Sequence, residues 1–481
     1  MNVIDFLTQQ SFALNLEKNT LAQITGTLKV DSRTIEPGDV YLALPLLNGN
    51  SHEPYVKEAQ QRGAVLILNF RDEGRKFWAK WAKNCFPRQP ETCVGVTGTN
   101  GKSSVVNFTR QLWEAAGLKA ASLGTLGLSS LFCDVSEFPL VGLTSPDPIT
   151  LHECLDGLAQ KKIQHLALEV SSHGLDQHRL DEVQFAAAAF MNLHHEHLDY
   201  HGSMGHYFAA KCRLFTELLP ASGTAVLNRD NHYGQKLAKI CAERGQSILW
   251  FGRKEGDINL VHLQAHPKGL ILDVSILEKT VRVDVPLIGA FQAENVLAAL
   301  GLVVGSGMKP EQAIEGLKHL RSVPGRMEPV GQTLSGGLVF VDYAHKPYAL
   351  ENVLKSVRAH ISGKVIVVFG CGGNRDTAKR KMMGAIAAQW ADEVIITDDN
   401  PRQEKASDIR SEIMRGCPGA EEIRSRREAI AYGLKRLDRG DVCIIAGKGH
   451  EQGQIMGSVV LPFDDREVAR ELLRIEGGEA A

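Results

Sequence analysis

Long apolar runs, clustered cysteines and an excess of one sign of charge are all missing from this sequence. No stretch approaches about 18 uninterrupted apolar residues, which argues against a membrane-spanning helix. The first residues, MNVIDFLTQQSF, contain no basic segment followed by a long apolar run, so we expect no signal peptide. The nine cysteines are scattered without a C-x-x-C pair, which fits a reducing cytoplasm better than a disulfide framework. The formal net charge of -2 gives no overall basic field, so we expect a cytoplasmic protein that binds no nucleic acid and inserts in no membrane.

The length and apolar content of the chain leave room for several hydrophobic cores. The sequence has 481 residues, of which 43% are apolar, and a chain of this length usually forms about two to four domains. The polar, proline-containing segment 84–91 and the stretch VPGR at 323–326 have the composition of hinges. We therefore predict three domains, at 1–88, 89–325 and 326–481.

The alternation of strand, turn and helix patterns predicts an α/β fold. Strand candidates in the middle of the chain are HLALEV (165–170), FAAAAFMNL (185–193), TAVLN (224–228) and SILWF (247–251). Beyond the second hinge the candidates are LVFVDY (338–343), KVIVVFG (364–370), EVIITDD (393–399) and DVCIIAG (441–447). Helix-compatible segments separate these last four, which predicts a doubly wound, Rossmann-like parallel sheet for the last domain.

A glycine-rich turn, GVTGTNGKS at 95–103, follows an apolar strand candidate and precedes a segment whose apolar residues recur at helical spacing. Glycines let backbone N–H groups approach a polyphosphate, and a helix N-terminus adds positive potential. Lys102 would neutralise the phosphates, and the Ser103 hydroxyl would bind Mg²⁺. The strict G-x-x-x-x-G-K-[ST] spacing is not met, because Val96 stands where its first glycine belongs. An ordinary glycine turn is therefore the alternative.

The segment HHEHLDYH at 194–201 packs four histidines and two acids into eight residues. His197 and His201, at i and i+4, could bind zinc on a helix face, although no H-E-x-x-H pattern or cysteine partner accompanies them. A solvated polar loop without metal is a second interpretation. A third pairs this loop with the phosphate loop, because Mg²⁺ prefers oxygen ligands and Glu169, at the end of a strand candidate, could supply one. A helix-capping role for Glu169 stays open.

Polar loops follow all four strand candidates of the last domain: DYAHKP, GCGGNRD, DDNPR and GKGHE. Open α/β sheets bind ligands at the carboxyl ends of their strands, so these loops should converge on one rim. The rim would carry Arg375 and Arg402 beside Asp399, Asn400 and Glu451. Such an array suits a zwitterion with two ammonium and two carboxylate groups, because an arginine fork matches a carboxylate better than a lone ammonium does. A surface turn held by local ion pairs is the alternative.

Taken together, these segments resemble the Mur ligases, the ATP-dependent amino-acid-adding enzymes of peptidoglycan synthesis. The loop TGTNGKS has the variant spacing of that family. The similarity covers nearly the whole chain and includes EVSSHGLDQHR (169–179), HLDYHGSMGHYFAAK (197–211), GAFQAEN (289–295), GRME (325–328), DYAHKP (342–347), GCGGNRD (370–376), DDNPR (398–402) and AGKGHE (446–451). Within the family the motifs are most similar to those of members that add meso-diaminopimelate, whose signature is DNPR.

The resemblance implies an architecture and a reaction. The N-terminal α/β domain would bind the UDP-muramyl dipeptide, the central P-loop ATPase-like domain with a mostly parallel sheet would bind ATP, and the C-terminal Rossmann-like domain would bind the amino acid. The D-glutamate γ-carboxylate of UDP-N-acetylmuramoyl-L-alanyl-D-glutamate would attack ATP to give an acyl phosphate, which the diaminopimelate amine then attacks. Mg²⁺, Lys102 and Arg326 would neutralise the anions that meet. We expect a monomer with these small molecules as its partners.

The resemblance also assigns residues. The positions matching ATP contacts are Gly98, Thr99, Asn100, Gly101, Lys102, Ser103, Ser104, Asn295, Arg326, Asp342 and His345. Those matching UDP-muramyl-dipeptide contacts are Ser32, Thr144, Ser145, Ser171, Gln177 and Arg179. Those matching diaminopimelate contacts are Arg375, Asp399, Asn400, Arg402, Gly447 and Glu451. Magnesium ligands would be Ser103, Glu169, His197 and Lys211, and the catalytic set would be Lys102, Lys211, Glu169 and His197.

Lys211 matches a lysine that the family carries as a carbamate, since added CO₂ turns an ammonium, which cannot bind a cation, into a carboxylate-like group. From the sequence alone, a surface helix lysine would be the simpler interpretation. Three segments depart from the common family forms. LHHEHLDYH replaces LSRDHLDYH, HKP replaces HTP, and LPLLNGNSHEPY (44–55) differs enough that we assign no residue in it.

Two rival functions remain open at this point. A lysine-adding ligase, or another family member such as a folylpolyglutamate synthetase, would use the same nucleotide chemistry. A lysine site would leave Arg402 without a carboxylate, at a cost of about 2–5 kcal/mol. A P-loop regulatory switch would hydrolyse ATP without any uridine nucleotide, and it would leave the DDNPR rim unexplained.

Overall fold

A computed structural model of the chain describes residues 2–10, 17–44, 51–70, 73–138, 143–253, 255–277 and 279–481. The chain forms two compact units. The first unit comprises Met1–Lys102, Gly117–Leu249 and Gly305–Gly307, and the second comprises Ser103–Ala116, Trp250–Val304 and Met308–Ala481. No helix in the described ranges has the length and apolar character needed to cross a membrane.

A small parallel sheet begins the first unit, with strand order β1-β2-β3. Its elements are α1 (Val3–Gln9), α2 (Lys18–Gln23), β1 (Leu28–Lys29), β2 (Val40–Ala43), α3 (Glu53–Gln61), β3 (Leu66–Asn69) and α4 (Gly74–Cys85). Phe6 of α1 packs against Phe77 and Trp81 of α4, with ring centroids 5.1 and 5.0 Å apart. Aromatic burial therefore supplies much of the core that so few short strands could not form alone.

The main sheet of the first unit has the order β9-β8-β4-β7-β5-β6, and its strands are parallel except for β6. The strands are β4 (Thr92–Thr97), β5 (Ala120–Gly124), β6 (Gly127–Ser130), β7 (His165–Glu169), β8 (Ala187–Phe190) and β9 (Thr224–Asn228). The helices are α6 (Pro148–Gln160), α7 (Ser172–Asp176), α8 (Leu198–His201), α9 (Met204–Arg213) and α10 (His232–Glu243). The small and apolar residues of β5 and β8 are buried throughout, as expected for parallel strands covered on both faces.

The second unit contains an antiparallel ribbon and three helices ahead of its larger sheet. The strands β11 (Ile258–His266), β12 (Gly269–Ile276) and β13 (Lys279–Val285) pair antiparallel in chain order, and β10 (Ser247–Gly252) pairs parallel with β11. The helices are α5 (Lys102–Ala115), α11 (Phe291–Gly305) and α12 (Pro310–Gly316). Nearly all of α11 is buried, which agrees with its almost uninterrupted apolar sequence.

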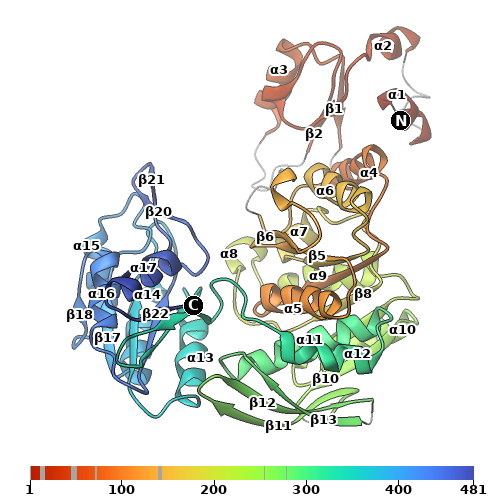
Figure 1. The fold of residues 1–481 in the computed structure, drawn as a ribbon. Coiled ribbons are helices and arrows are strands. Elements are labelled where there is room, and N and C mark those ends of the chain that lie inside the picture. The colour runs from red at the N-terminus through yellow and green to blue at the C-terminus, as the bar shows by residue number, and fades with distance from the viewer. Residues whose placement is uncertain are drawn as a thin grey trace. The chain divides into compact units, whose positions relative to one another are not determined.

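The larger sheet of the second unit, whose strands β17, β18 and β22 are labelled in Figure 1, has the order β18-β17-β16-β19-β15-β14-β22. Its strands are β14 (Glu328–Gln332), β15 (Leu338–Asp342), β16 (Val365–Phe369), β17 (Glu393–Ile396), β18 (Glu421–Glu422), β19 (Val442–Ala446) and β22 (Glu479–Ala480). The five from β15 to β19 are parallel, whereas β14 and β22 run antiparallel to their neighbours. The four predicted strands are therefore confirmed, each ending one to three residues earlier than the apolar run suggested.

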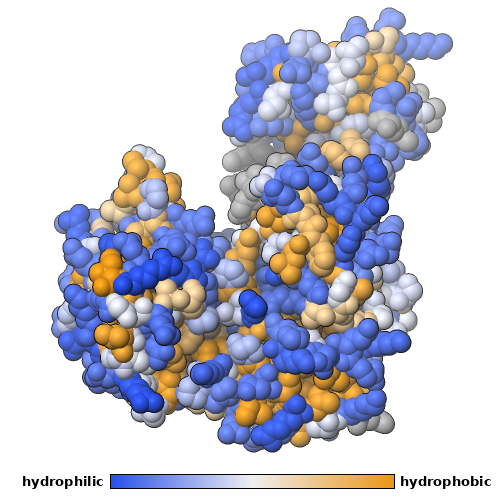
Figure 2. All heavy atoms as spheres, in the orientation of Figure 1, coloured by the Kyte–Doolittle hydropathy of each residue, from blue (hydrophilic) through white to orange (hydrophobic). Residues whose placement is uncertain are grey.

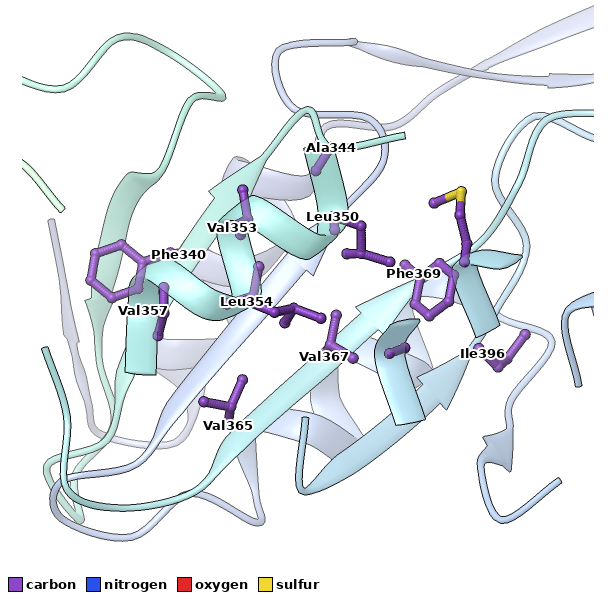
Figure 3. Packing of buried hydrophobic residues seen from close by; sticks show 14 of the residues in the cluster. Phe340, Ala344, Leu350, Val353, Leu354, Val357, Val365, Val367, Phe369 and Ile396 are labelled. Atoms are coloured by element: carbon purple, nitrogen blue, oxygen red, sulfur yellow. The ribbon is translucent and has the colours of Figure 1, made fainter. Parts of the chain in front are cut away.

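Helices cover both faces of this sheet. They are α13 (Pro347–Arg358), α14 (Ala378–Trp390), α15 (Ala406–Met414), α16 (Arg426–Leu434) and α17 (Asp465–Ile475). One core contains Leu350 and Leu354 of α13, which lie against Val367 and Phe369 of β16 (Figure 3). A second core, with Ile430 from α16, fills the opposite face. The α/β class and the doubly wound sheet are confirmed, and the three-domain boundaries at 88 and 325 stay a prediction.

Candidate active site

The predicted phosphate loop lies in the first unit, between the end of β4 and the start of α5. Gly98 and Gly101 adopt φ values of +154° and +88°, which favour glycine, and a Cβ at Gly98 would lie 2.8 Å from that of Met191. Lys102 Nζ donates to the carbonyl oxygens of Gly98 (2.9 Å) and Thr99 (3.1 Å). The ammonium therefore folds over the loop, where it would meet a bound phosphate.

Asn192, which follows β8, fixes the loop from outside. Its carbonyl accepts the Thr99 N–H at 3.0 Å, and its Oδ1 accepts the Asn100 N–H at 2.9 Å. The sequence prediction missed Asn192. Asn192 lies inside the strand candidate 185–193, and nothing near it in the sequence indicated that it would contact the phosphate loop.

Lys211, on α9, reaches the same loop from the other side. Its side chain is 1% exposed, and Nζ donates to the Gly98 carbonyl at 3.0 Å and to Thr97 Oγ1 at 3.5 Å. Burial, and then the nearby Lys102, hold the pKa of Lys211 well below its usual value. No carboxylate among the described residues pairs with it. The simpler interpretation of Lys211 as a surface lysine is therefore wrong.

Tyr207, one helical turn before Lys211, was also missed. Its ring lies 4.7 Å from Lys211 Nζ, and its hydroxyl is 3.2 Å from Thr99 Oγ1. Burial raises the pKa of Tyr207 to about 12, so the hydroxyl stays protonated. Its position at i−4 from Lys211 was the available signal.

Glu169 ends β7 and is 2% exposed. Its two carboxylate oxygens accept the backbone N–H of Thr125 (3.0 Å) and the Thr125 hydroxyl (3.2 Å). Only a glycine fits at Gly124, where a Cβ would overlap this carboxylate. The contacts hold an acidic group at the strand end without a positive partner among the described side chains, which suits a cation ligand.

His197 precedes α8 with a φ of +57°, and its Nε2 lies 3.2 Å from Glu196 Oε1. Burial, followed by the charges of Lys102 and Lys211, lowers the pKa of His197 to about 4. The ring is therefore neutral near pH 7 and can donate a lone pair to a metal. In the part of the chain that the structure describes, no group of three or more histidine, cysteine or acidic side chains is arranged for a metal ion. The zinc alternative, which needs such a group, gains no support.

The residues assigned to the muramyl substrate form a hydrogen-bonded cluster next to Glu169. Ser145 Oγ lies 3.1 Å from Ser171 Oγ and donates to the Glu169 carbonyl at 3.2 Å. Arg179 donates to the Ser145 carbonyl at 2.9 Å and to Gln177 Oε1 at 2.6 Å.

Two further assigned residues have partners of their own. Thr144 Oγ1 is 2.9 Å from the Thr125 hydroxyl, so it joins the same cluster. Ser32, in the small N-terminal sheet, donates to Glu58 at 2.7 Å. Residues 45–50, in the loop that received no assignment, lie outside the described residues.

In the second unit, three residues assigned to ATP gather around Tyr343. Arg326 lies 4.4 Å from the Tyr343 ring, and its Nε is buried without a hydrogen-bond partner among the described residues. His345 Nδ1 is 2.8 Å from the Tyr343 carbonyl, and burial lowers its pKa to about 4. The Asp342 carboxylate accepts two backbone hydrogen bonds, from the N–H groups of Met327 and Ala344, each at 2.7 Å.

The remaining nucleotide assignments lie on helices of the second unit. Ser103 and Ser104 stand in the first turn of α5 and are both buried. Asn295, on α11, donates to Gln292 Oε1 at 2.8 Å. None of these observations tests a contact with ATP, so the assignment of these three residues stays a prediction.

The rim of the larger sheet brings the predicted amino-acid residues together. Asn400 Nδ2 donates to Glu451 Oε2 at 2.9 Å. Asp399 is 8% exposed, and none of the described residues donates a hydrogen bond to its carboxylate. Arg402 Nη1 donates to the carbonyl oxygens of Gly373 (2.9 Å) and Asn400 (3.4 Å).

Neither predicted arginine of the rim forms an ion pair with a described residue, and Arg375 is exposed. The loop does contain one ion pair, between Asp398 and Arg410, but its residues Asp398, Asp399 and Asn400 are buried, so the alternative of a surface turn does not describe it. The rim offers the carboxylates of Asp399 and Glu451 and two guanidinium groups. Of these four groups, only Glu451 forms an ion pair among the described residues, with Lys448. This is the pattern expected for a charged ligand.

Replacing Gly447 with alanine tests the geometry of the rim. Gly447 has a φ of +115°, and a Cβ there would lie 2.8 Å from Asp399 Oδ2. We expect Gly447→Ala to raise the KM for the amino-acid substrate at least about tenfold, because the strained backbone and the crowded carboxylate both disturb the site. Steady-state kinetics check this, with Gly307→Ala as a matched control at a glycine of φ +106° whose Cβ would meet nothing within 4 Å. Equal effects of the two substitutions would contradict the prediction.

Comparisons with known proteins agree with this arrangement. The Mur ligase middle domain model matches residues 96–303, and the Mur ligase, glutamate ligase domain model matches residues 325–449. The UDP-N-acetylmuramoyl-L-alanyl-D-glutamate–2,6-diaminopimelate ligase of Rhizobium meliloti is 43% identical over 461 residues, 93% of this chain and 94% of that protein. The protein of the same name from Brucella melitensis is 43% identical over 465 residues, 94% of each chain. A solved structure of a ligase of that name superposes with a TM-score of 0.70 at 29% identity, covering 98% of this chain and 99% of the other.

Proposed function

Since the chain belongs to the Mur ligase family, we propose that it adds meso-2,6-diaminopimelate to the D-glutamate γ-carboxylate of UDP-N-acetylmuramoyl-L-alanyl-D-glutamate, with ATP converted to ADP and phosphate. The observation that carries the choice of amino acid is Arg402, which is half-buried at the rim and whose guanidinium has only carbonyl partners among the described residues. Its guanidinium matches the second carboxylate of a diamino diacid, which lysine lacks.

The ATP-dependent step begins at the phosphate loop. The D-glutamate γ-carboxylate attacks the γ-phosphorus of ATP. The bond between that phosphorus and ADP breaks, and an acyl phosphate forms. Two anions must approach each other, so positive charge is required where they meet. Lys102 supplies it, held over the loop by the Gly98 and Thr99 carbonyls. The diaminopimelate ammonium group first loses a proton to become an amine. The amine then attacks the acyl carbon, the bond between that carbon and the phosphate oxygen breaks, and phosphate leaves and takes up the proton that the amide nitrogen loses.

The donor set of the first unit fits magnesium. Glu169 offers a carboxylate with no positive partner among the described residues, and His197 offers a neutral ring. Lys211 is buried without a described acidic partner, which is unfavourable for an ammonium and favourable for a neutral amine. A neutral amine can add CO₂, and the carbamate would turn Lys211 into an oxygen ligand. Bound Mg²⁺ would shield the phosphate charge and orient the γ-phosphoryl group.

The amino-acid site uses the rim of the second unit. Asp399 and Glu451 would accept the ammonium groups of diaminopimelate, while Arg402 and Arg375 would bind its carboxylates. The assignments of Asn295, Arg326, Asp342 and His345 to ATP, and of Ser32 with the Ser145 cluster to the nucleotide sugar, belong to the same proposal. We further propose a cytoplasmic monomer that works with small molecules alone.

Phosphate release with two amino acids tests the function. The purified protein is incubated with ATP, Mg²⁺ and UDP-muramyl dipeptide, plus either meso-diaminopimelate or L-lysine. We expect release with diaminopimelate to exceed that with lysine at least about 30-fold, because an unpaired Arg402 would cost the lysine complex about 2–5 kcal/mol. Equal or reversed rates would assign a lysine-adding ligase. Sustained ATP hydrolysis without the uridine nucleotide would instead favour a regulatory ATPase.

A further inference from the structure

A β-hairpin that follows the rim takes part in holding the amino-acid site. Its strands are β20 (Gly453–Met456) and β21 (Val459–Pro462), which pair antiparallel. Val459 and Val460 are 55% and 62% exposed, and Figure 2 shows hydrophobic residues at this tip. The hairpin buries so little that packing into a core does not explain its position.

Backbone contacts tie this hairpin to the Asp399–Arg402 segment instead. Arg402 N–H donates to the Ile455 carbonyl at 3.1 Å, and Gly457 N–H donates to the Arg402 carbonyl at 2.8 Å. Ile455 N–H donates to Asn400 Oδ1 at 2.9 Å. These bonds hold Arg402 at a φ of +52°, a conformation that costs a non-glycine residue free energy and persists only when its surroundings impose it.

Lys448 connects the hairpin to the polar groups of the site. Its side chain is 0% exposed. Nζ donates to the Gly453 carbonyl at 2.6 Å, and to Asn400 Oδ1 and Glu451 Oε2 at 3.2 Å each. An ammonium has three protons, so this set uses all of them. Lys448 therefore has no donor left for a substrate.

The bonds of Lys448 decide which atoms the site presents. Asn400 Oδ1 accepts from both Lys448 and Ile455, so the amide must turn Nδ2 toward Glu451. Glu451 Oε2 receives both of the carboxylate's described hydrogen bonds, from Asn400 Nδ2 and Lys448 Nζ. Glu451 Oε1 and the second Nδ2 proton of Asn400 are left for a ligand.

We propose that Lys448 is a positioning residue for the amino-acid substrate: its buried ammonium holds Asn400 so that an amide N–H faces a substrate carboxylate, and holds Glu451 so that Oε1 accepts from a substrate ammonium group, with the β20–β21 hairpin as the second support. This inference rests on the proposed ligase function. Lys448 contacts no substrate, and it acts through the two residues that do.

Stability alone does not account for a lysine at this position. Burying an ammonium costs several kcal/mol in desolvation, and replacing a buried ion pair with apolar residues of similar volume is often neutral for folding. All three ammonium protons of Lys448 are donated to groups at the rim, and this is better explained by the orientation that these bonds impose on Asn400 and Glu451. The substitution Lys448→Met, which keeps the length of the side chain, separates these two roles.

The test compares Lys448→Met with wild type in the full ligase reaction. We expect the KM for diaminopimelate to rise at least about tenfold, corresponding to the loss of one or more positioning hydrogen bonds, while the KM for ATP and for UDP-muramyl dipeptide changes less than about twofold. Single-turnover ADP formation without amino acid should stay at the wild-type rate. Lys355→Met is the matched control, because it removes a lysine–glutamate pair on α13 that is not part of the rim.

The outcomes separate the two proposals. If the wild-type protein shows no diaminopimelate-dependent phosphate release, the proposed ligase function is wrong. If wild type is active and folded Lys448→Met keeps a wild-type KM for diaminopimelate, or if all three KM values rise together, the positioning role is overturned. If Lys448→Met does not fold, Gln454→Met replaces it, since Gln454 Nε2 donates to the Asp399 carbonyl at 2.7 Å from the same hairpin. A selective rise in the KM for diaminopimelate would again support the positioning role of Lys448 and the hairpin, and an unchanged value would overturn it.

Discussion

Lys211→Ala is expected to lower turnover at least about 1000-fold, the upper range for loss of one preorganised electrostatic group. Lys211 is 1% exposed, and among the described residues it donates only to Gly98 and Thr97, in the strand and loop that precede Lys102. Because burial and Lys102 depress its pKa, its amine is available for CO₂, and the proposed carbamate would supply a magnesium ligand. Alanine removes that ligand altogether. Phosphate release under saturating substrates measures the loss.

Chemical rescue distinguishes a missing ligand from a damaged fold. Lys211→Ala leaves space for a small carboxylate such as acetate, so added acetate should restore part of the activity. Lys211→Met fills the space with a side chain that carries no ligand, so it should be equally inactive and should not respond to acetate. Lys239→Ala, at an exposed position of α10, should keep the wild-type rate. Wild-type turnover in Lys211→Ala would exclude the carbamate role.

Arg402→Ala should raise the KM for diaminopimelate by roughly 30-fold to several thousand-fold, as follows from about 2–5 kcal/mol for a lost buried charge partner. The guanidinium has only carbonyl partners in the described structure, so its remaining donors are available for the second carboxylate of the substrate. The KM for ATP should change little, because ATP is assigned to other loops. Initial rates with each substrate varied in turn measure both constants.

Two further variants sharpen this prediction. Arg402→Lys keeps the charge but loses the planar fork, so it should recover only part of the affinity. Arg427→Ala removes an exposed arginine that pairs with Glu471 and should leave both constants unchanged. Arg402→Ala should also narrow the preference for diaminopimelate over lysine. Parallel increases in the KM for ATP and for diaminopimelate would count against a role in selecting the amino acid.

The sequence was most informative where function follows from local pattern. A β-branched run ending in a polar loop predicted β15, β16, β17 and β19, and the rule that ligands bind at strand ends predicted that Asp399, Asn400 and Glu451 would meet. Asn400 does contact Glu451, although 51 residues separate them. The phosphate loop was recognisable from its glycines and from the helix that follows it.

The supporting roles of Asn192 and Lys448 were not recognisable from the sequence, because they depend on contacts between distant segments. Asn192 holds Asn100 across 92 residues, and nothing in its own neighbourhood indicates that partner. Lys448 stands in the motif AGKGHE, whose residues Gly447 and Glu451 were assigned to diaminopimelate. The burial of its side chain shows that the ammonium faces inward, and the sequence gives no sign of this. Lys211 likewise looked like a surface lysine until its burial was known. Local propensity describes elements, whereas burial and long-range bonds emerge from packing.

A crystal structure of the protein with meso-diaminopimelate bound tests the central claim most directly. We predict that one carboxylate of the ligand lies within hydrogen-bond distance of the Arg402 guanidinium, with an ammonium group against Asp399 or Glu451. A ligand bound away from the rim, or one whose carboxylates both avoid Arg402, would contradict the account of how this chain selects its amino acid.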